Sequence, residues 1–100
     1  MKIEIQSIHF DADSKLLDFI RKKVQKVTTF FEGIPKADIY LRINRDAEKN
    51  SKIVEIKLTV VGIPVFVKEN SNTFESAIDQ AVEKLKVQVK KHKEKLQSKN

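Results

Sequence analysis

The chain has 100 residues, of which 40% are hydrophobic and 34% charged, with no cysteine and a formal net charge of +6 at pH 7. This length favours a single modest core, so we expect one domain over residues 1–100. The lack of cysteine excludes disulfides, thiolate metal sites and cysteine nucleophiles. The first ten residues lack the apolar region of a signal peptide and no apolar run approaches a membrane span, so we expect a cytoplasmic protein with no membrane partner.

The first third of the sequence predicts a strand followed by a helix. Apolar and polar residues alternate over about residues 2–8, which is typical of a strand with one buried face. Asp13 is a good candidate to cap a helix over about residues 14–31, whose apolar stripe is Leu16, Ile20, Val24, Val27 and Phe31. Gly33 and Pro35 then end this helix, because glycine tolerates a left-handed cap and proline cannot continue the hydrogen-bond ladder.

Three further strands are predicted in the middle of the chain. Residues 39–43 alternate between apolar and polar side chains, residues 45–51 are polar and predict a loop, and residues 54–60 alternate again. Gly62, Ile63 and Pro64 predict a turn, and a short fourth strand starts at Val65 and Val67.

A long helix closes the chain. Residues 71–73 can cap it, and it is predicted to run from Phe74 to about Gln97 with an inner stripe of Phe74, Ile78, Ala81, Leu85, Val89 and Leu96. The order is therefore β-α-β-β-β-α. Since each strand has one apolar face and both helices are amphipathic, we expect an α+β two-layer sandwich, with a four-stranded sheet and two helices packed on one face.

The net charge is concentrated at the end of the sequence. Residues 84–100 hold seven lysines and one acidic residue, Glu94, whereas the charges of residues 1–83 sum to zero. A helix with clustered ammonium groups suits a polyanion, because each lysine can displace a condensed counterion from a phosphate. Nucleic acid is therefore the first partner to consider. The alternative is an ordinary solvated helix, on which lysine stems cover the edges of the core.

A helical wheel at about 100° per residue places lysines on both sides of the apolar stripe of the last helix. One flank holds Lys86, Lys90 and Lys93, and the other holds Lys84, Lys91 and Lys95. On the first helix, Lys23 and Lys26 share one flank and Lys22 lies toward the back. If the helices pack side by side, one lysine flank of each borders a shared groove that could follow a phosphate backbone. The wheel leaves open which flanks meet.

No catalytic set is found in the sequence. His9 and His92 are the two histidines, and neither has a carboxylate or second histidine at a metal-binding helical spacing. Gly33 and Gly62 are isolated, so no glycine-rich phosphate loop exists. We therefore expect no enzyme, no metal, no cofactor and no small-molecule substrate.

The last helix resembles the closing helix of the bacterial ribosome-hibernation factors, namely hibernation-promoting factor and its paralogue, ribosome-associated inhibitor A. The matching residues are Ala77-Ile78-Asp79, Lys84-Leu85, Gln88 and Lys91-His92-Lys93-Glu94-Lys95. The first helix is similar to the family's apolar and lysine pattern through Phe19, Ile20, Lys23, Lys26 and Phe31. The sequence departs from the family at residues 73–75, where Asp-Met-Tyr is common, and at Val87, where arginine often stands.

This resemblance implies a function in ribosome hibernation. Factors of this family bind the small ribosomal subunit in the channel used by messenger RNA and by A- and P-site transfer RNA, and they inhibit translation. The expected partner is thus the small subunit with its rRNA, and the expected protein is the short form without a C-terminal dimerisation domain, monomeric off the ribosome. Together with the helical wheel, the resemblance gives the candidate rRNA-binding residues Lys22, Lys23, Lys26, Lys84, Lys86, Lys90, Lys91, Lys93 and Lys95.

Two other functions fit the same elements. A sheet covered by two helices is also the layout of a free-standing double-stranded-RNA-binding domain. The apolar run Val65-Phe66-Val67 in the fourth strand instead suggests a protein-interaction module that uses a sheet edge.

Overall fold

The computed structural model describes residues 2–30, 34, 36–45, 51–60 and 63–97, and the side chains of all of these except 28–30, 60, 63 and 95–97. Six elements follow in the predicted order: β1 (Lys2–Ser7), α1 (Ser14–Phe30), β2 (Lys36–Asn44), β3 (Ser51–Val60), β4 (Ile63–Ser71) and α2 (Phe74–Gln97). The predicted β-α-β-β-β-α sandwich is confirmed. Of the predicted stops and stripe residues, Phe31, Gly33, Pro35 and Gly62 lie outside the described residues, and the side chain of Leu96 lies outside the described side chains.

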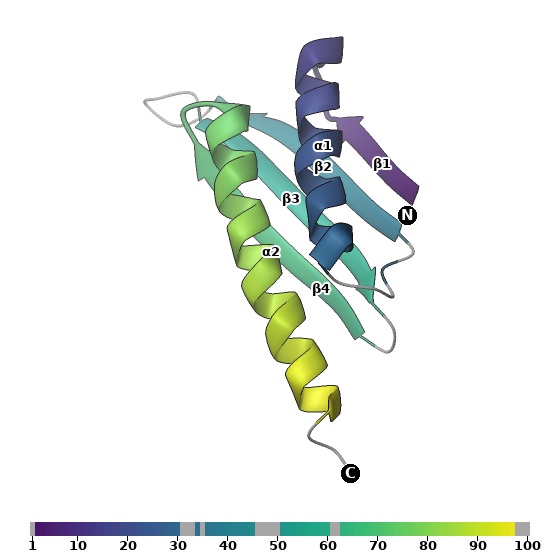
Figure 1. The fold of residues 1–100 in the computed structure, drawn as a ribbon. Helices are drawn as coiled ribbons and strands as arrows, with labels where there is room; N and C mark the ends of the chain where they lie inside the picture. The colour runs from purple at the N-terminus through teal and green to yellow at the C-terminus, as the bar shows by residue number, and fades with distance from the viewer. Residues whose placement is uncertain (1, 31–33, 35, 46–50, 61–62, 98–100) are drawn as a thin grey trace.

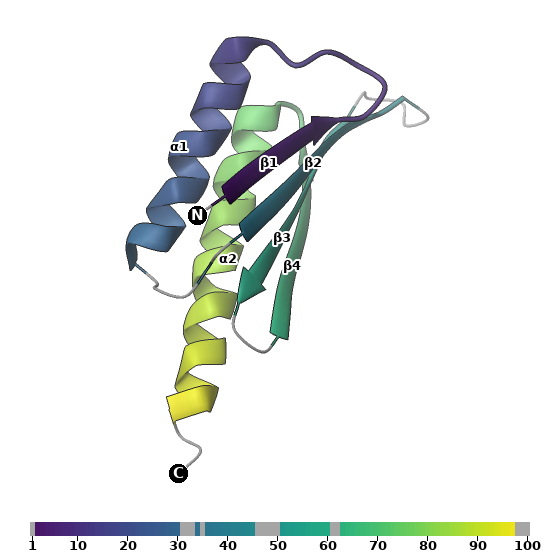
Figure 2. The same ribbon diagram turned by 90° about the vertical axis from the view of Figure 1, so that its right-hand side faces the viewer.

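The sheet has the strand order β1-β2-β3-β4. Because helix α1 carries the chain back to the start of the sheet, β2 pairs with β1 in parallel, whereas β2–β3 and β3–β4 are antiparallel. Both helices lie on the same face of this sheet, α1 over the β1–β2 side and α2 over the β3–β4 side (Figures 1 and 2).

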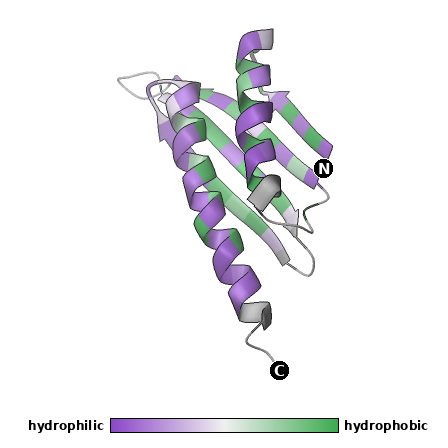
Figure 3. Cartoon of the chain, viewed as in Figure 1, coloured by the Kyte–Doolittle hydropathy of each residue, from purple (hydrophilic) through white to green (hydrophobic). Residues whose placement is uncertain are grey.

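The core lies between this sheet face and the helices. Register places Ile39, Ile56 and Val67 in one row across three strands, and each of them is buried. The helical stripes close over these rows with Ile20, Val24 and Val27 from α1 and Phe74, Ile78, Ala81, Leu85 and Val89 from α2. The surfaces of both helices that face away from the sheet are mostly hydrophilic (Figure 3).

The fourth strand is longer than the predicted short strand. It covers nine residues, starts at Ile63 within the predicted turn, and continues through Lys68, Glu69 and Asn70 to Ser71. The sequence did not predict this end of the strand, because Glu69 stands where the alternation requires an apolar side chain on the helix-covered face. Pairing with β3 along its whole length supplies the backbone hydrogen bonds that keep this polar end extended.

Both helices begin at the predicted caps. The Leu16 N–H donates a 2.8 Å hydrogen bond to Asp13 Oδ1, and the Ser76 N–H donates a 3.1 Å bond to Thr73 Oγ1. Each bond satisfies an amide that has no partner inside its helix. The two caps lie at the same end of the sandwich, so α1 and α2 run in the same direction (Figure 1).

Truncating Leu85 tests the buried stripe of α2. Leu85 is fully buried, so Leu85→Ala leaves a cavity and is expected to lower the free energy of unfolding by about 2–5 kcal/mol in urea denaturation. Val87→Ala on the exposed side of the same helix is the matched control and should change it by less than about 0.5 kcal/mol. Equal effects of the two substitutions would contradict the assigned orientation of α2.

Removing the cap of α1 tests its N-terminus. Asp13→Ala is expected to cost about 0.5–2 kcal/mol of unfolding free energy, because the Leu16 amide loses its acceptor. Asp11→Ala removes the same charge two residues earlier, where the described residues show no hydrogen bond to the helix, and should cost clearly less. A larger cost for Asp11→Ala would refute the capping role of Asp13.

Candidate nucleic-acid interface

A shallow groove runs between the two helices. Its walls are Lys23 and Lys26 from α1, and Asp79, Val82, Glu83 and Lys86 from α2. The burial of each apolar stripe against the sheet turns these flanks toward one another. The pairing of flanks that the wheel left open is thereby settled: the Lys23 and Lys26 flank of α1 meets the Lys86 flank of α2.

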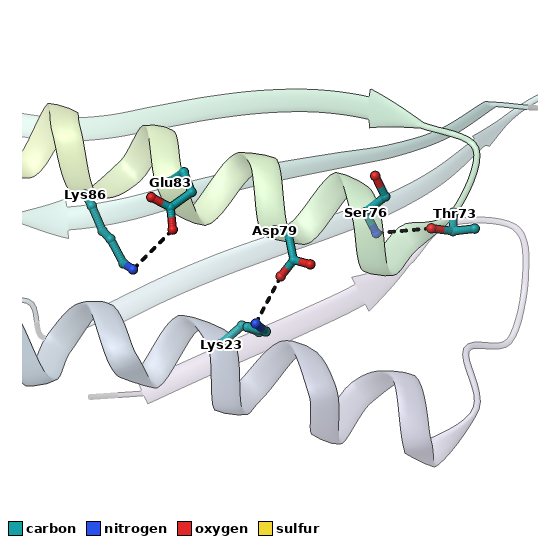
Figure 4. A network of polar contacts seen from close by, with 6 residues as sticks. All are labelled: Lys23, Thr73, Ser76, Asp79, Glu83 and Lys86. Atoms are coloured by element: carbon teal, nitrogen blue, oxygen red, sulfur yellow. Dashed lines mark hydrogen bonds and ion pairs between the residues drawn. The ribbon is translucent and has the colours of Figure 1, made fainter.

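Two of the three groove lysines have carboxylate partners, and Lys26 forms no ion pair with the described side chains. Lys23 Nζ lies 3.1 Å from Asp79 Oδ1 across the groove, and Lys86 Nζ lies 3.3 Å from Glu83 Oε1 one turn away on the same helix (Figure 4). The Lys23 ammonium also lies 5.5 Å from the centre of the Phe19 ring. Because these acids stand among the lysines, the groove carries much less positive charge than its lysines alone would give.

Lys84 lies on the other flank of α2 and also has a partner. Its ammonium forms an ion pair with Glu69 of β4, whose side chain is only 12% exposed. Lys84 itself remains 60% exposed. This pair explains how β4 accommodates a carboxylate on the helix-covered face, since the ammonium compensates the charge there.

The last two turns of α2, residues 90–97, carry a net charge of +3 and are called the distal segment below. They contain four lysines and one acid, Glu94. Lys90 and Lys91 are exposed, and Lys93 is half-buried. The described side chains form no ion pair with Lys90 or Lys91. The distal segment projects past the end of the sheet (Figure 1).

The candidate lysines are thus divided among three places. Lys22 lies with Lys23 and Lys26 around a hollow on the surface of α1. Lys90 and Lys93 continue the groove flank of α2, whereas Lys91 lies on the flank of Lys84. The side chain of Lys95 lies outside the described ones. The distal segment therefore presents positive charge on both flanks of one helix, and the groove joins one of these flanks to α1.

Sequence reasoning missed the acidic partners Glu69, Asp79 and Glu83. The spacing of three between Glu83 and Lys86 was a readable signal, because such residues are neighbours on a helix surface. The pairs Lys23–Asp79 and Lys84–Glu69 join different elements. No pattern within one element could have indicated them.

Metal and membrane chemistry find no support in the described part of the chain. Among these residues no group of three or more His, Asp or Glu side chains could hold a metal ion. None of the helices described is long and apolar enough to span a bilayer.

Comparisons with known proteins agree with the motifs in the helices. Residues 3–97 match the family described as sigma 54 modulation protein / S30EA ribosomal protein. A ribosome hibernation promoting factor of Pseudomonas putida is 31% identical over 98 residues, which cover 98% of this chain and 92% of that protein. A ribosome hibernation promotion factor of Bacillus subtilis is 26% identical over 99 residues, and the match spans 52% of its length.

Solved structures show the same fold. A ribosomal subunit interface protein of Coxiella burnetii superposes with a TM-score of 0.83 at 22% identity, covering 93% of this chain and 98% of that one. The N-terminal domain of Protein Y of Thermus thermophilus gives a TM-score of 0.80 at 25% identity, covering 92% and 99%. The resemblance to the ribosome-hibernation factors is confirmed, and this chain belongs to the sigma 54 modulation protein / S30EA ribosomal protein family.

Proposed function

We propose that this protein binds the small ribosomal subunit, in the channel that carries messenger RNA and the A- and P-site transfer RNAs, and inhibits translation in hibernating ribosomes. The observation that carries the proposal is the distal segment of α2, where lysines lie on both flanks of a helix that projects from the sheet. Membership of the family and the names of its relatives support the choice of the ribosome over other polyanions.

The mechanism is electrostatic. Lysines that contact phosphates release condensed counterions, and this release favours binding without reading a base sequence. The domain is elongated, with extents of 50 × 26 × 18 Å, so α2 can be inserted along an RNA-lined channel while the sheet stays behind it. A domain held in that channel excludes messenger and transfer RNA by occupying their space. This action needs no catalytic residue, and the ribosome as partner implies the cytoplasm as compartment.

Removing three charges from the distal segment tests this mechanism. The triple variant Lys90→Gln, Lys91→Gln, Lys93→Gln is expected to bind small subunits at least about tenfold more weakly. The slope of log K against log salt concentration should become shallower by about 0.7–0.9 for each lost phosphate contact. The measurement is co-sedimentation with purified small subunits over a range of salt concentrations, with and without competing transfer RNA.

The control removes the same number of charges from the opposite side of the molecule. The control combines Lys2→Gln, Lys57→Gln and Lys68→Gln. These three lysines lie on the face of the sheet that the helices do not cover. This triple variant should keep the affinity and salt dependence of the unaltered protein within about twofold. Equal weakening by both triple variants would refute the assignment to α2, since it would show a response to net charge alone.

The competing function is a free-standing double-stranded-RNA-binding domain. A protein of that class binds a naked duplex as tightly as it binds ribosomes, whereas a small-subunit factor binds the duplex far more weakly. A gel shift with a generic RNA duplex separates the two. Tight duplex binding without competition from transfer RNA on the subunit would refute the proposed function.

A further inference from the structure

Some lysines of the two helices have a carboxylate partner, and others, which include Lys22 and Lys26 on α1, form no ion pair with the described side chains. Lys23, Lys84 and Lys86 each have a carboxylate partner, in Asp79, Glu69 and Glu83 respectively. All three partnered lysines lie over the sheet. The exposed lysines of the distal segment, Lys90 and Lys91, form no ion pair with the described side chains. On α2, the charges of Lys84 and Lys86 are therefore compensated within the protein, whereas those of Lys90 and Lys91 are not compensated by an ion pair with the described side chains.

We infer that Asp79 and Glu83 are specificity-determining residues, which hold the groove lysines away from generic RNA while permitting the ribosomal site to engage them. The inference rests on the proposed function and names residues that act within the same surface. Both carboxylates stand in the wall of the groove that Lys23, Lys26 and Lys86 share. A phosphate that binds Lys23 or Lys86 in this groove must displace the carboxylate that now pairs with that lysine. The phosphate is then also repelled by the displaced carboxylate, which stays nearby.

The free-energy cost of displacing Asp79 and Glu83 discriminates between polyanions. A generic duplex can bind the distal segment alone, so it has no need to enter the groove and gains little by doing so. A folded rRNA site with phosphates on both sides of the groove can contact Lys23, Lys26 and Lys86 together, and the combined contacts exceed the cost of displacing two acids. The carboxylates thus lower the affinity for the wrong polyanion more than for the right one.

Asp79 and Glu83 contribute little to the stability of the fold. The side chains of Asp79 and Glu83 are 54% and 74% exposed, and the amide at the start of α2 is capped by Thr73 instead. An ion pair at this exposure adds little to stability, because solvent screens it and two long side chains are immobilised. Removing both carboxylates should therefore leave the protein folded, and the effect on RNA binding can be read directly.

The test is the double variant Asp79→Asn, Glu83→Gln in the full chain. Its affinity for a generic RNA duplex should rise by about two- to fivefold for each carboxylate removed, the range given by the strength of an exposed ion pair. For duplex binding, the slope of log K against log salt concentration should become steeper by about 0.7–0.9 for each lysine that now contacts phosphate. Affinity for small subunits should rise less, so the preference for subunits over duplex should fall.

The matched control is Glu75→Gln, which removes an acid from the first turn of the same helix; Glu75 does not line the groove but a separate hollow with Lys15 and Phe19 of α1. It should leave duplex affinity within about twofold. Urea denaturation of both variants verifies that each is folded.

Three results would overturn the inference. The first is unchanged duplex binding by the double variant while the unaltered protein binds small subunits. The second is an equal gain, per charge removed, from Glu75→Gln. The third is an equal gain on duplex and on subunits. Failure of the unaltered protein to bind small subunits is a different result, and it refutes the proposed function together with the inference.

Discussion

The apolar face of the sheet has to be covered, and this requirement fixes the direction of every lysine on the helices. Ile39, Ile56 and Val67 form an apolar row, and the two amphipathic helices laid side by side shield this face of the sheet from water. Once Leu85 and Val89 face that row, the side chains at the edges of their stripe must border either the neighbouring helix or the sheet edge. The groove of lysines is thus a consequence of core packing.

The lengths of the elements explain why the charge is divided along α2. A helix of 24 residues is about 36 Å long, whereas a strand of nine residues spans about 30 Å. The helix therefore outruns the sheet. Over the sheet, its lysines lie near acids, since Lys84 pairs with Glu69 of β4 and Lys86 pairs with Glu83 of α2 itself. Beyond Val89 the helix extends past the sheet, and Lys90 and Lys91 form no ion pair with the described side chains.

The sequence predicted what is local and missed what depends on tertiary contacts. Alternation and helical periodicity gave the element order, both caps and the buried stripes, because each signal lies within one element. The end of β4 was missed because Glu69 interrupts the alternation, and the reason it is tolerated, Lys84, lies on a different element. The wheel likewise placed Lys23 and Lys86 on flanks. Only the packed structure could decide that these flanks meet and that Asp79 stands between them.

The lysines of the distal segment matter both for the stability of the helix end and for the proposed binding of a polyanion. The carbonyl groups at the end of a helix carry partial negative charge, and lysines in the last turns stabilise them. The same lysines repel one another, because Glu94 is the sole acid in this segment. Among the side chains described on α2, Val89 is the last fully buried one, and His92 is half-buried. Under the proposed function, a bound polyanion relieves this repulsion and stabilises the end of the helix, so that binding and the stability of this segment are coupled.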